Sequence, residues 1–198
     1  MIGGVIGVSV LGGFIWLMIF LNARQKKRRE IFWNELASKH NLSLTSRKKS
    51  FLHIALFNLE GTVANQPVSI QETVKGSGNH QRYYVSIETA FSPGYSFCIR
   101  KEGILTQIIN LVGIHDIIFR DEEIDKTYNL KSDNEDEFRR LLVGHKLEEL
   151  RLIKNQFDGV LICNNYKLSY TVQMQLNNSE KVSDLEAAMA FVLLLVSK

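Results

Sequence analysis

The hydrophobic positions divide the chain into two parts with different patterns. Residues 2–21 form an apolar run in which Ser9 is the only polar side chain. After residue 50, apolar positions alternate with polar ones in short segments that are separated by turn residues. The first pattern predicts one long apolar helix, and the second predicts a set of β-strands.

The apolar run has the length of a membrane span. Its twenty residues would rise about 30 Å as an α-helix, which matches the hydrocarbon core of a bilayer. Lys or Arg occupies five of the six positions from Arg24 to Arg29, and such a cluster stays on the cytoplasmic side. We therefore expect a transmembrane helix over residues 1–22, with the N-terminus outside and the rest of the chain in the cytoplasm. A cleaved signal peptide, the alternative, would place the positive charge before the apolar run.

Small residues recur within this run. Gly3 and Gly7 form a G-x-x-x-G pattern, which lets two membrane helices approach closely and would support a homodimer. The alternative is that glycine is simply common in membrane helices.

Residues 23–49 are predicted as a basic juxtamembrane helix and a linker. Ile31, Phe32, Trp33 and Leu36 recur at helical spacing, and Asn41 is a plausible stop. Basic side chains next to a membrane attract anionic lipid; their alternative role is to determine topology alone. The side chains predicted to contact lipid are Arg24, Lys26, Lys27, Arg28 and Arg29.

Residues 50–198 are predicted to form one α+β domain, an antiparallel β-sheet covered by helices. The clearest strand signal is the strict alternation over residues 166–176. The other strands are expected at 52–56 (ended by Gly61), 68–74, 83–89, 95–99, 127–130 and 160–163, and residues 114–119 are expected to form a short strand or a turn. Helices are expected at 102–112, at 132–143 and 183–196 behind capping boxes that start at Ser132 and Ser183, and at 145–157.

Composition narrows the function classes. The chain has 198 residues, of which 45% are hydrophobic, and only two are cysteines; this excludes a disordered chain and a disulfide-rich scaffold. The net charge of +3 is the sum of a basic N-terminal part and an acidic remainder. Residues 1–50 carry nine Lys or Arg and two acids, whereas the remaining 148 carry 15 basic and 19 acidic residues. The acidic balance of the domain argues against nucleic acid as its partner.

The richest ionisable segment runs from His115 to Asp125. Carboxylate and imidazole groups are ligands for divalent cations, so a metal-dependent enzyme is one hypothesis. The simpler interpretation is a solvated acidic turn between two strands. The residues of the metal hypothesis are His115, Asp116, Asp121 and Asp125.

Other catalytic signatures are absent from the sequence. Cys98 and Cys163 each lie in an apolar strand, which predicts buried reduced thiols; a cysteine nucleophile is the alternative. The sequence contains no G-x-S-x-G motif and no H-E-x-x-H motif. We therefore predict no catalytic residue and no cofactor.

Three segments carry a resemblance to a family. They are W-N-E-L-A-S-K-H-N-L (33–42), the segment G-I-H-D-I-I-F-R-D-E-E-I-D-K-T-Y-N-L-K-S (113–132) and F-R-R-L-L (138–142). Together with the apolar N-terminus, they resemble a class of small, uncharacterised bacterial membrane-anchored proteins. The resemblance implies a bacterial inner-membrane protein with a cytoplasmic domain, and it implies no site residues.

The sequence thus favours a non-enzymatic, single-pass membrane protein whose cytoplasmic domain is a binding or scaffold module. Its expected partners are membrane lipid at the N-terminal helix and a protein, which includes a second copy of the chain. The alternatives are the metal-dependent enzyme and a module that binds anionic lipid headgroups.

Overall fold

The computed structural model describes residues 2–49, 54–76, 80–103, 114–164 and 166–197. Within these ranges, it gives no side-chain description for residues 2–15, 17–19, 21, 22, 48, 49 and 54. The helix predicted over 102–112 falls almost entirely outside the described residues.

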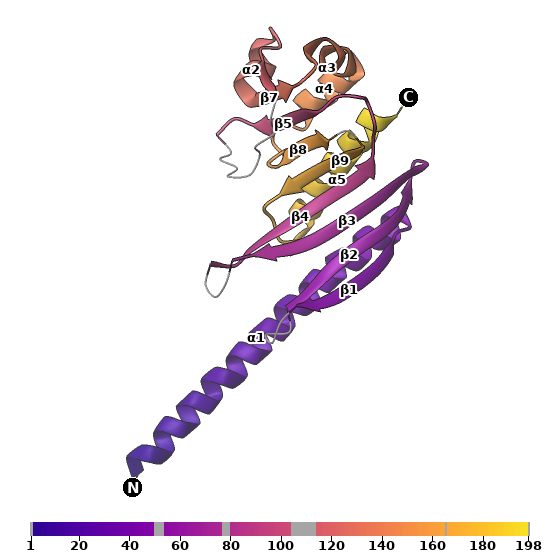
Figure 1. Ribbon diagram of the computed structural model, residues 1–198. Helices are drawn as coiled ribbons and strands as arrows, with labels where there is room; N and C mark the ends of the chain where they lie inside the picture. The colour runs from indigo at the N-terminus through magenta and orange to yellow at the C-terminus, as the bar shows by residue number, and fades with distance from the viewer. Residues whose placement is uncertain (1, 50–53, 77–79, 104–113, 165, 198) are drawn as a thin grey trace.

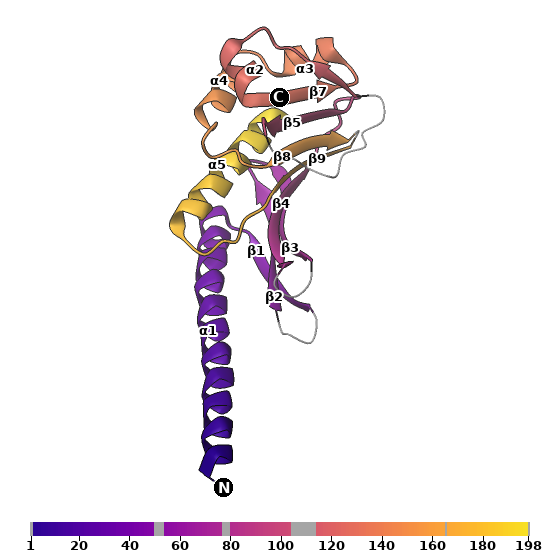
Figure 2. The ribbon, with the colours of Figure 1, turned by 90° about the vertical axis from the view of Figure 1, so that its left-hand side faces the viewer.

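The chain begins with one uninterrupted helix, α1 (Ile2–His40), of 39 residues. It ends where Asn41 adopts a φ of 53°, a left-handed conformation that asparagine tolerates. The predicted helix stop is therefore confirmed. Figures 1 and 2 show the first half of α1 projecting away from the folded part, while its second half lies against the sheet.

In the part of the chain that is described, no helix combines the length and apolar character needed to cross a bilayer. Most of the side chains of residues 1–22 are not described, so the transmembrane helix stays a prediction.

The nine strands form a single antiparallel sheet in the order β1-β2-β3-β4-β9-β8-β5-β7-β6, which confirms the α+β class with a large antiparallel sheet. The strands are β1 (Ser43–Lys49), β2 (Ile54–Val63), β3 (Gln66–Lys75), β4 (Arg82–Ala90), β5 (Phe97–Lys101), β6 (His115–Ile117), β7 (Tyr128–Ser132), β8 (Val160–Asn164) and β9 (Lys167–Val172).

Strand register gives the sheet one apolar face. A single row of register partners crosses all nine strands and is apolar throughout. Because side chains alternate between faces, the flanking row that crosses β2, β3, β4 and β9 is polar: Asn58, Gln71, Ser86 and Thr171. The apolar row is Leu44, Leu59, Ile70, Ile87, Tyr170, Leu161, Ile99, Leu130 and Ile117.

Two helices cover the apolar face. They are the second half of α1 and α5 (Ser179–Val196), both on the same side of the sheet in Figure 2. Trp33 and Leu36 of α1 are fully buried. Phe157 lies between Tyr170 of β9 and Phe191 of α5, with ring centroids 5.0 and 6.1 Å away. Three short helices lie near β7: α2 (Glu122–Thr127), α3 (Glu135–Leu141) and α4 (His145–Leu152).

Several predicted boundaries were wrong. Gly61 does not end its strand, because β2 continues to Val63. The alternation of residues 166–176 extends past the strand, which ends at Val172. Helix α5 begins after the N-cap Asn178, whose side chain accepts the N–H of Lys181, so Ser183 is inside the helix.

The predicted linker also contributes to the fold. Residues 43–49 form the edge strand β1, paired along its whole length with β2, and Leu42 is buried in the core. Alternation is weak in β1, since its residues are mostly polar or charged, and no hydrophobic pattern therefore indicated it.

Candidate functional site

A buried ion pair lies where α1 meets the sheet. The Nη2 atom of Arg29 contacts Oε2 of Glu72 on β3, and it also donates to the carbonyl oxygen of Ala55 on β2 at 3.1 Å. The same carboxylate oxygen accepts the backbone N–H of Phe57 at 3.4 Å. The exposed fractions of the two charged side chains are 6% and 0%. One arginine therefore connects the helix to two strands of the sheet.

Aromatic rings enclose this pair. The guanidinium carbon of Arg29 lies 4.9 Å from the ring centroid of Tyr83 and 5.4 Å from that of Phe57, at distances typical of cation–π contacts. Trp33 stacks on Phe57 with ring centroids 5.6 Å apart. Burial raises the pKa of Glu72, against the opposing effect of Arg29. A pair desolvated this way adds little net stability, and its hydrogen bonds join α1 to β2 and β3.

The position of Arg29 corrects one prediction. Arg29 was expected to contact lipid, but its side chain is buried against β2 and β3, where a headgroup cannot reach it. The other members of the set, Arg24, Lys26, Lys27 and Arg28, are exposed on α1. We call these four residues the basic collar; lipid contact by the collar stays a prediction.

Two exposed aromatic residues precede the basic collar. Trp16 and Phe20 are 67% and 50% exposed, and their rings stack with centroids 5.7 Å apart. Arg24 follows Phe20 by four residues and therefore lies on the same side of the helix. An aromatic pair followed by basic residues is typical of a helix that meets the headgroup region of a membrane.

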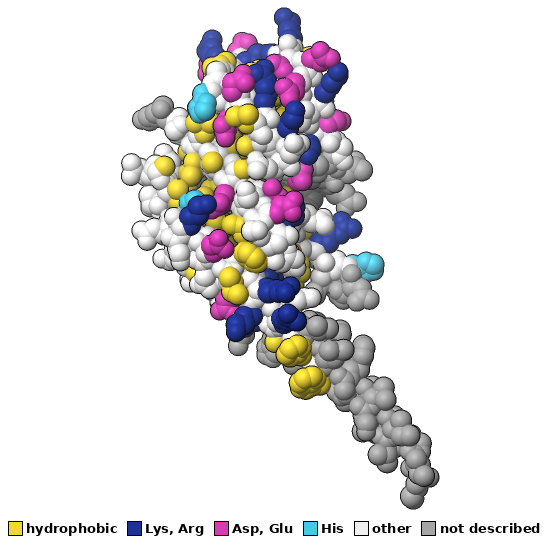
Figure 3. Space-filling view, turned by 180° about the vertical axis from the view of Figure 1, so that it is seen from behind, with side chains coloured by type: hydrophobic (Ala, Val, Ile, Leu, Met, Phe, Trp, Pro, Cys, Tyr) yellow, Lys and Arg dark blue, Asp and Glu magenta, His cyan; other side chains and the backbone are white. Residues whose placement is uncertain are grey.

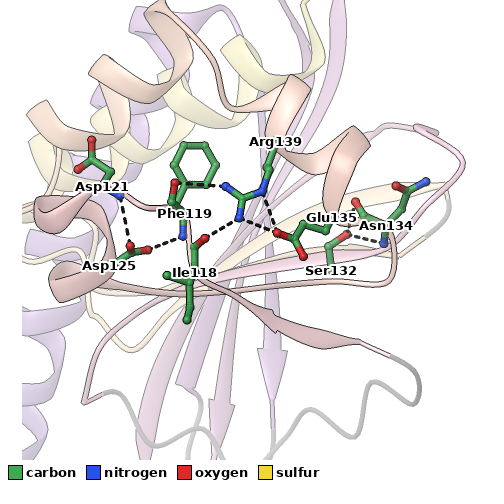
Figure 4. Close-up of polar contacts among 8 residues, drawn as sticks. All are labelled: Ile118, Phe119, Asp121, Asp125, Ser132, Asn134, Glu135 and Arg139. Carbon is green, nitrogen blue, oxygen red and sulfur yellow. Dashed lines mark hydrogen bonds and ion pairs between the residues drawn. The ribbon is translucent and has the colours of Figure 1, made fainter.

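In the acidic segment 115–125, backbone N–H groups donate hydrogen bonds to carboxylates of the same segment (Figure 4). Asp125 accepts the N–H groups of Phe119 at 2.7 Å and of Asp121 at 3.2 Å. Asp121 caps α2 by accepting the N–H of Ile124 at 3.1 Å, and it pairs with Arg151. These hydrogen bonds, first of all that of Ile124, lower the pKa of Asp121. The segment lies between two strands, β6 and β7, as predicted, but it contains the capped start of a short helix instead of a turn.

An arginine completes this cluster. Arg139 of α3 donates to the carbonyl oxygens of Ile118 at 2.5 Å and of Phe119 at 3.2 Å, and it pairs with Glu135 at 2.6 Å. The arrangement connects α3 to the loop before α2. The contacts of Arg139 therefore have a structural role.

The four residues of the metal hypothesis do not converge. His115 and Asp116 lie exposed on β6, and Asp116 pairs with Lys131 at 2.8 Å. Asp121 and Asp125 are close to each other, but both are engaged as described above. Among the described residues, no group of three or more His, Cys, Asp or Glu side chains could hold a metal ion.

Both cysteines are buried. Cys98 is 2% exposed and Cys163 is 0% exposed. Burial raises the pKa of Cys98 to about 11 and that of Cys163 to about 12. Since the thiolate is the reactive form, neither group is prepared for nucleophilic attack at neutral pH.

A shallow groove of about 550 Å³ lies over the ends of β2, β3, β4 and β9. Glu88 and Lys167 form an ion pair at 2.6 Å within it, and the hydroxyl of Thr89 donates to the carbonyl oxygen of Pro67 at 2.8 Å. Two of its three charged side chains are thus paired with each other, and the third, Glu60, accepts from Asn58 at 2.8 Å. The lining comprises Glu60, Gly61, Pro67, Val68, Ser69, Glu88, Thr89, Ala90, Tyr166 and Lys167.

Comparison with known proteins identifies a structural neighbour. No protein-family model matches the chain, and no curated protein sequence does. The fold resembles the crystal structure of the mycobacterial trehalose monomycolate transport factor A, TtfA. The TM-score is 0.52 at 12% sequence identity, and the alignment covers 86% of this chain and 94% of TtfA. At this identity, the likeness to TtfA is one of fold.

The central feature of the site, the pair between Arg29 and Glu72, was missed from sequence. Val68, Ile70, Glu72 and Val74 share one side of β3, so Glu72 occupies an inward position between apolar residues. A charge at such a position requires a partner. That signal was available, and helical spacing relative to Trp33 leaves Arg29 and Lys26 as the two candidate partners in the basic run.

Proposed function

We propose that the chain is a single-pass membrane protein whose α+β domain is a binding or scaffold module, held on the cytoplasmic side of a bacterial membrane. The observation that carries this proposal is the continuity of α1. The same helix contains the apolar run and the residues that enter the core, Arg29, Trp33 and Leu36. The domain is therefore fixed to the apolar segment without an intervening loop.

The described side chains with reactive groups have structural roles, which is compatible with a binding role. In the described ranges, the acidic side chains of the metal hypothesis act as helix caps and ion-pair partners, and both thiols are buried. The structural neighbour TtfA is a transport factor, and a shared fold with such a factor fits a binding or scaffold role. The expected partners are lipid at the N-terminus and a protein at the domain.

Extraction of the full chain tests the membrane anchor. We expect the protein to stay in the membrane pellet after an alkaline carbonate wash. Changing Ile6→Lys with Leu11→Lys places two charges in the apolar run, at about 3 kcal/mol each for insertion, and should release the protein. The matched control, Ala23→Lys with Gln25→Lys, adds the same charge beside the basic collar and should behave as the wild type. Release of the wild-type chain by carbonate would contradict the proposal.

Reporter fusions test the orientation. A reporter active only in the cytoplasm should be active when fused after residue 40 and at the C-terminus, and one active only outside the inner membrane should be silent at both positions. The opposite pattern would overturn the localisation.

A further inference from the structure

The strands of the N-terminal half of the sheet run alongside α1 (Figure 1). Arg29 contacts Ala55 of β2, and Trp33 contacts Phe57 two residues later. A Cβ on Gly61 would stand 2.8 Å from the side chain of Leu42. Strand β2 therefore runs in the same direction as α1. Its antiparallel neighbour β3 runs back toward the N-terminal half of the helix.

This direction brings the β3–β4 hairpin to the level of the basic collar. Lys75 lies three residues beyond Glu72, or about 10 Å further along the strand. Arg24 lies five residues before Arg29, or about 8 Å along the helix in the same direction. Since Glu72 contacts Arg29, Lys75 and Arg24 lie at nearly the same height along the axis of α1. Arg82 is the register partner of Lys75 and shares that height.

Charge is segregated along these strands. Lys75 and Arg82 are exposed, and the Nζ atom of Lys75 lies 5.1 Å from the ring centroid of Tyr84. The described residues of the hairpin, 73–76 and 80–84, include no acid. The acidic residues Glu60 and Glu88 lie toward the other end of the same strands. Figure 3 shows Lys and Arg side chains gathered where α1 leaves the folded part.

We propose that Lys75 and Arg82 form a second contact with anionic phospholipid headgroups, so that the sheet docks with its basic end on the membrane that holds α1. This inference rests on the proposed membrane anchor. The partner is anionic because both side chains are positively charged. It is the bilayer surface because both side chains lie at the same level as Arg24 along the axis of α1. Trp16 and Phe20 lie about two turns and one turn before Arg24 on α1, on the apolar side of the same proposed surface.

The test uses the full chain in lipid nanodiscs, with a fluorophore on an added thiol at His80→Cys, an exposed position in the hairpin. The native thiols are buried. Quenching by a lipid with a spin-labelled headgroup reports contact between the hairpin and the bilayer. We expect strong quenching in discs that contain phosphatidylglycerol, and less in purely zwitterionic discs or at high salt.

Neutralising the two cations separates the proposal from its alternatives. Each basic residue near an anionic surface changes the docking equilibrium about fivefold, so Lys75→Gln with Arg82→Gln should lower it roughly 25-fold. The control, Lys126→Gln with Lys154→Gln, makes the same charge change on and beside the short helices α2 and α4 and should leave quenching unchanged. Equal quenching in all variants, or none in the wild type, would overturn the inference and would leave a protein as the partner of the hairpin. Failure of the chain to copurify with the discs would instead overturn the anchor itself, and this inference with it.

Discussion

Arg29 on α1 and Glu72 on β3, forty-three residues apart in the chain, form an ion pair in which both side chains are buried. Two other polar atoms of the pair, Nε of Arg29 and Oε1 of Glu72, are buried and have no hydrogen-bond partner among the described residues. Such a pair is costly to break and inexpensive to replace as a whole.

The first prediction concerns this pair. Glu72→Gln leaves the guanidinium buried without a counter-charge, and we expect it to lower the free energy of unfolding by about 3–5 kcal/mol. The double variant Arg29→Met with Glu72→Met should recover most of that loss. Urea unfolding followed by circular dichroism measures both. The control Glu88→Gln removes the exposed pair with Lys167 and should cost at most about 1 kcal/mol; an equal loss at both positions would contradict the burial argument.

A second prediction concerns Gly159, which lies directly against β9. A Cβ at this position would stand 2.5 Å from Cζ of Tyr170 and 2.6 Å from the carbonyl oxygen of Thr171. Since the backbone oxygen cannot move away easily, Gly159→Ala should destabilise the domain by about 1–3 kcal/mol. Gly61→Ala is the comparison, because its closest obstacle is the end of the Leu42 side chain. The loss in melting temperature should be larger for Gly159.

A third prediction concerns the thiols. Burial raises the pKa of Cys98 to about 11 and that of Cys163 to about 12. Both should therefore react with a disulfide reagent only when the chain unfolds, at a rate that follows urea concentration. An exposed thiol introduced at His80 should react at once under native conditions. Rapid native labelling of either natural cysteine would reopen the hypothesis of a nucleophilic site.

A fourth prediction concerns pH. Burial alone would raise the pKa of Glu186 on α5, but its bonds to Lys39 at 2.7 Å and His40 at 3.0 Å lower it below 4.5. A lowered pKa means that the carboxylate stabilises the folded state above pH 4.5 and loses that effect as pH falls through the folded-state value. The difference in unfolding free energy between wild type and Glu186→Gln should therefore shrink in acid. A difference that grows below pH 4.5 would reverse the assignment.

The last prediction concerns metal. Asp121 and Asp125 accept backbone N–H groups at the start of α2, so their oxygens are engaged. Mg²⁺, Mn²⁺ and Zn²⁺ should leave the melting temperature unchanged, and a chelator should do the same, because a ligand stabilises only the state that binds it. Asp121→Ala should still lower stability by about 1 kcal/mol through loss of the cap. A metal-dependent rise that Asp125→Asn abolishes would restore the enzyme hypothesis.

Sequence reasoning was correct where the local pattern of residues is compatible with only one secondary structure. The alternation around Tyr170 predicted a strand with one buried face, and the basic run was correctly continued as a helix to Asn41. It failed where tertiary partners decide. The edge strand β1 has little hydrophobic pattern, because it pairs with β2 on one side only, and an edge strand often carries polar and charged residues.

The candidate site was harder to predict for the same reason. In a sequence, acidic residues that cap a helix cannot be distinguished from acidic residues that bind a metal. Only the positions of the N–H groups of Phe119 and Ile124 distinguish the two roles. In the same way, Arg29 differs from its neighbours only because its face of α1 points at Glu72.

Because α1 is continuous, it fixes the rotation of the domain about the helix axis relative to the apolar segment. Each residue of an α-helix turns the chain by about 100° and advances it by about 1.5 Å. One residue inserted between Phe20 and Arg24 would thus turn the domain by more than a quarter circle, whereas seven would restore nearly the original azimuth and raise the domain by about 10 Å. The length of one helix consequently sets both the azimuth of the domain and its height above the apolar segment.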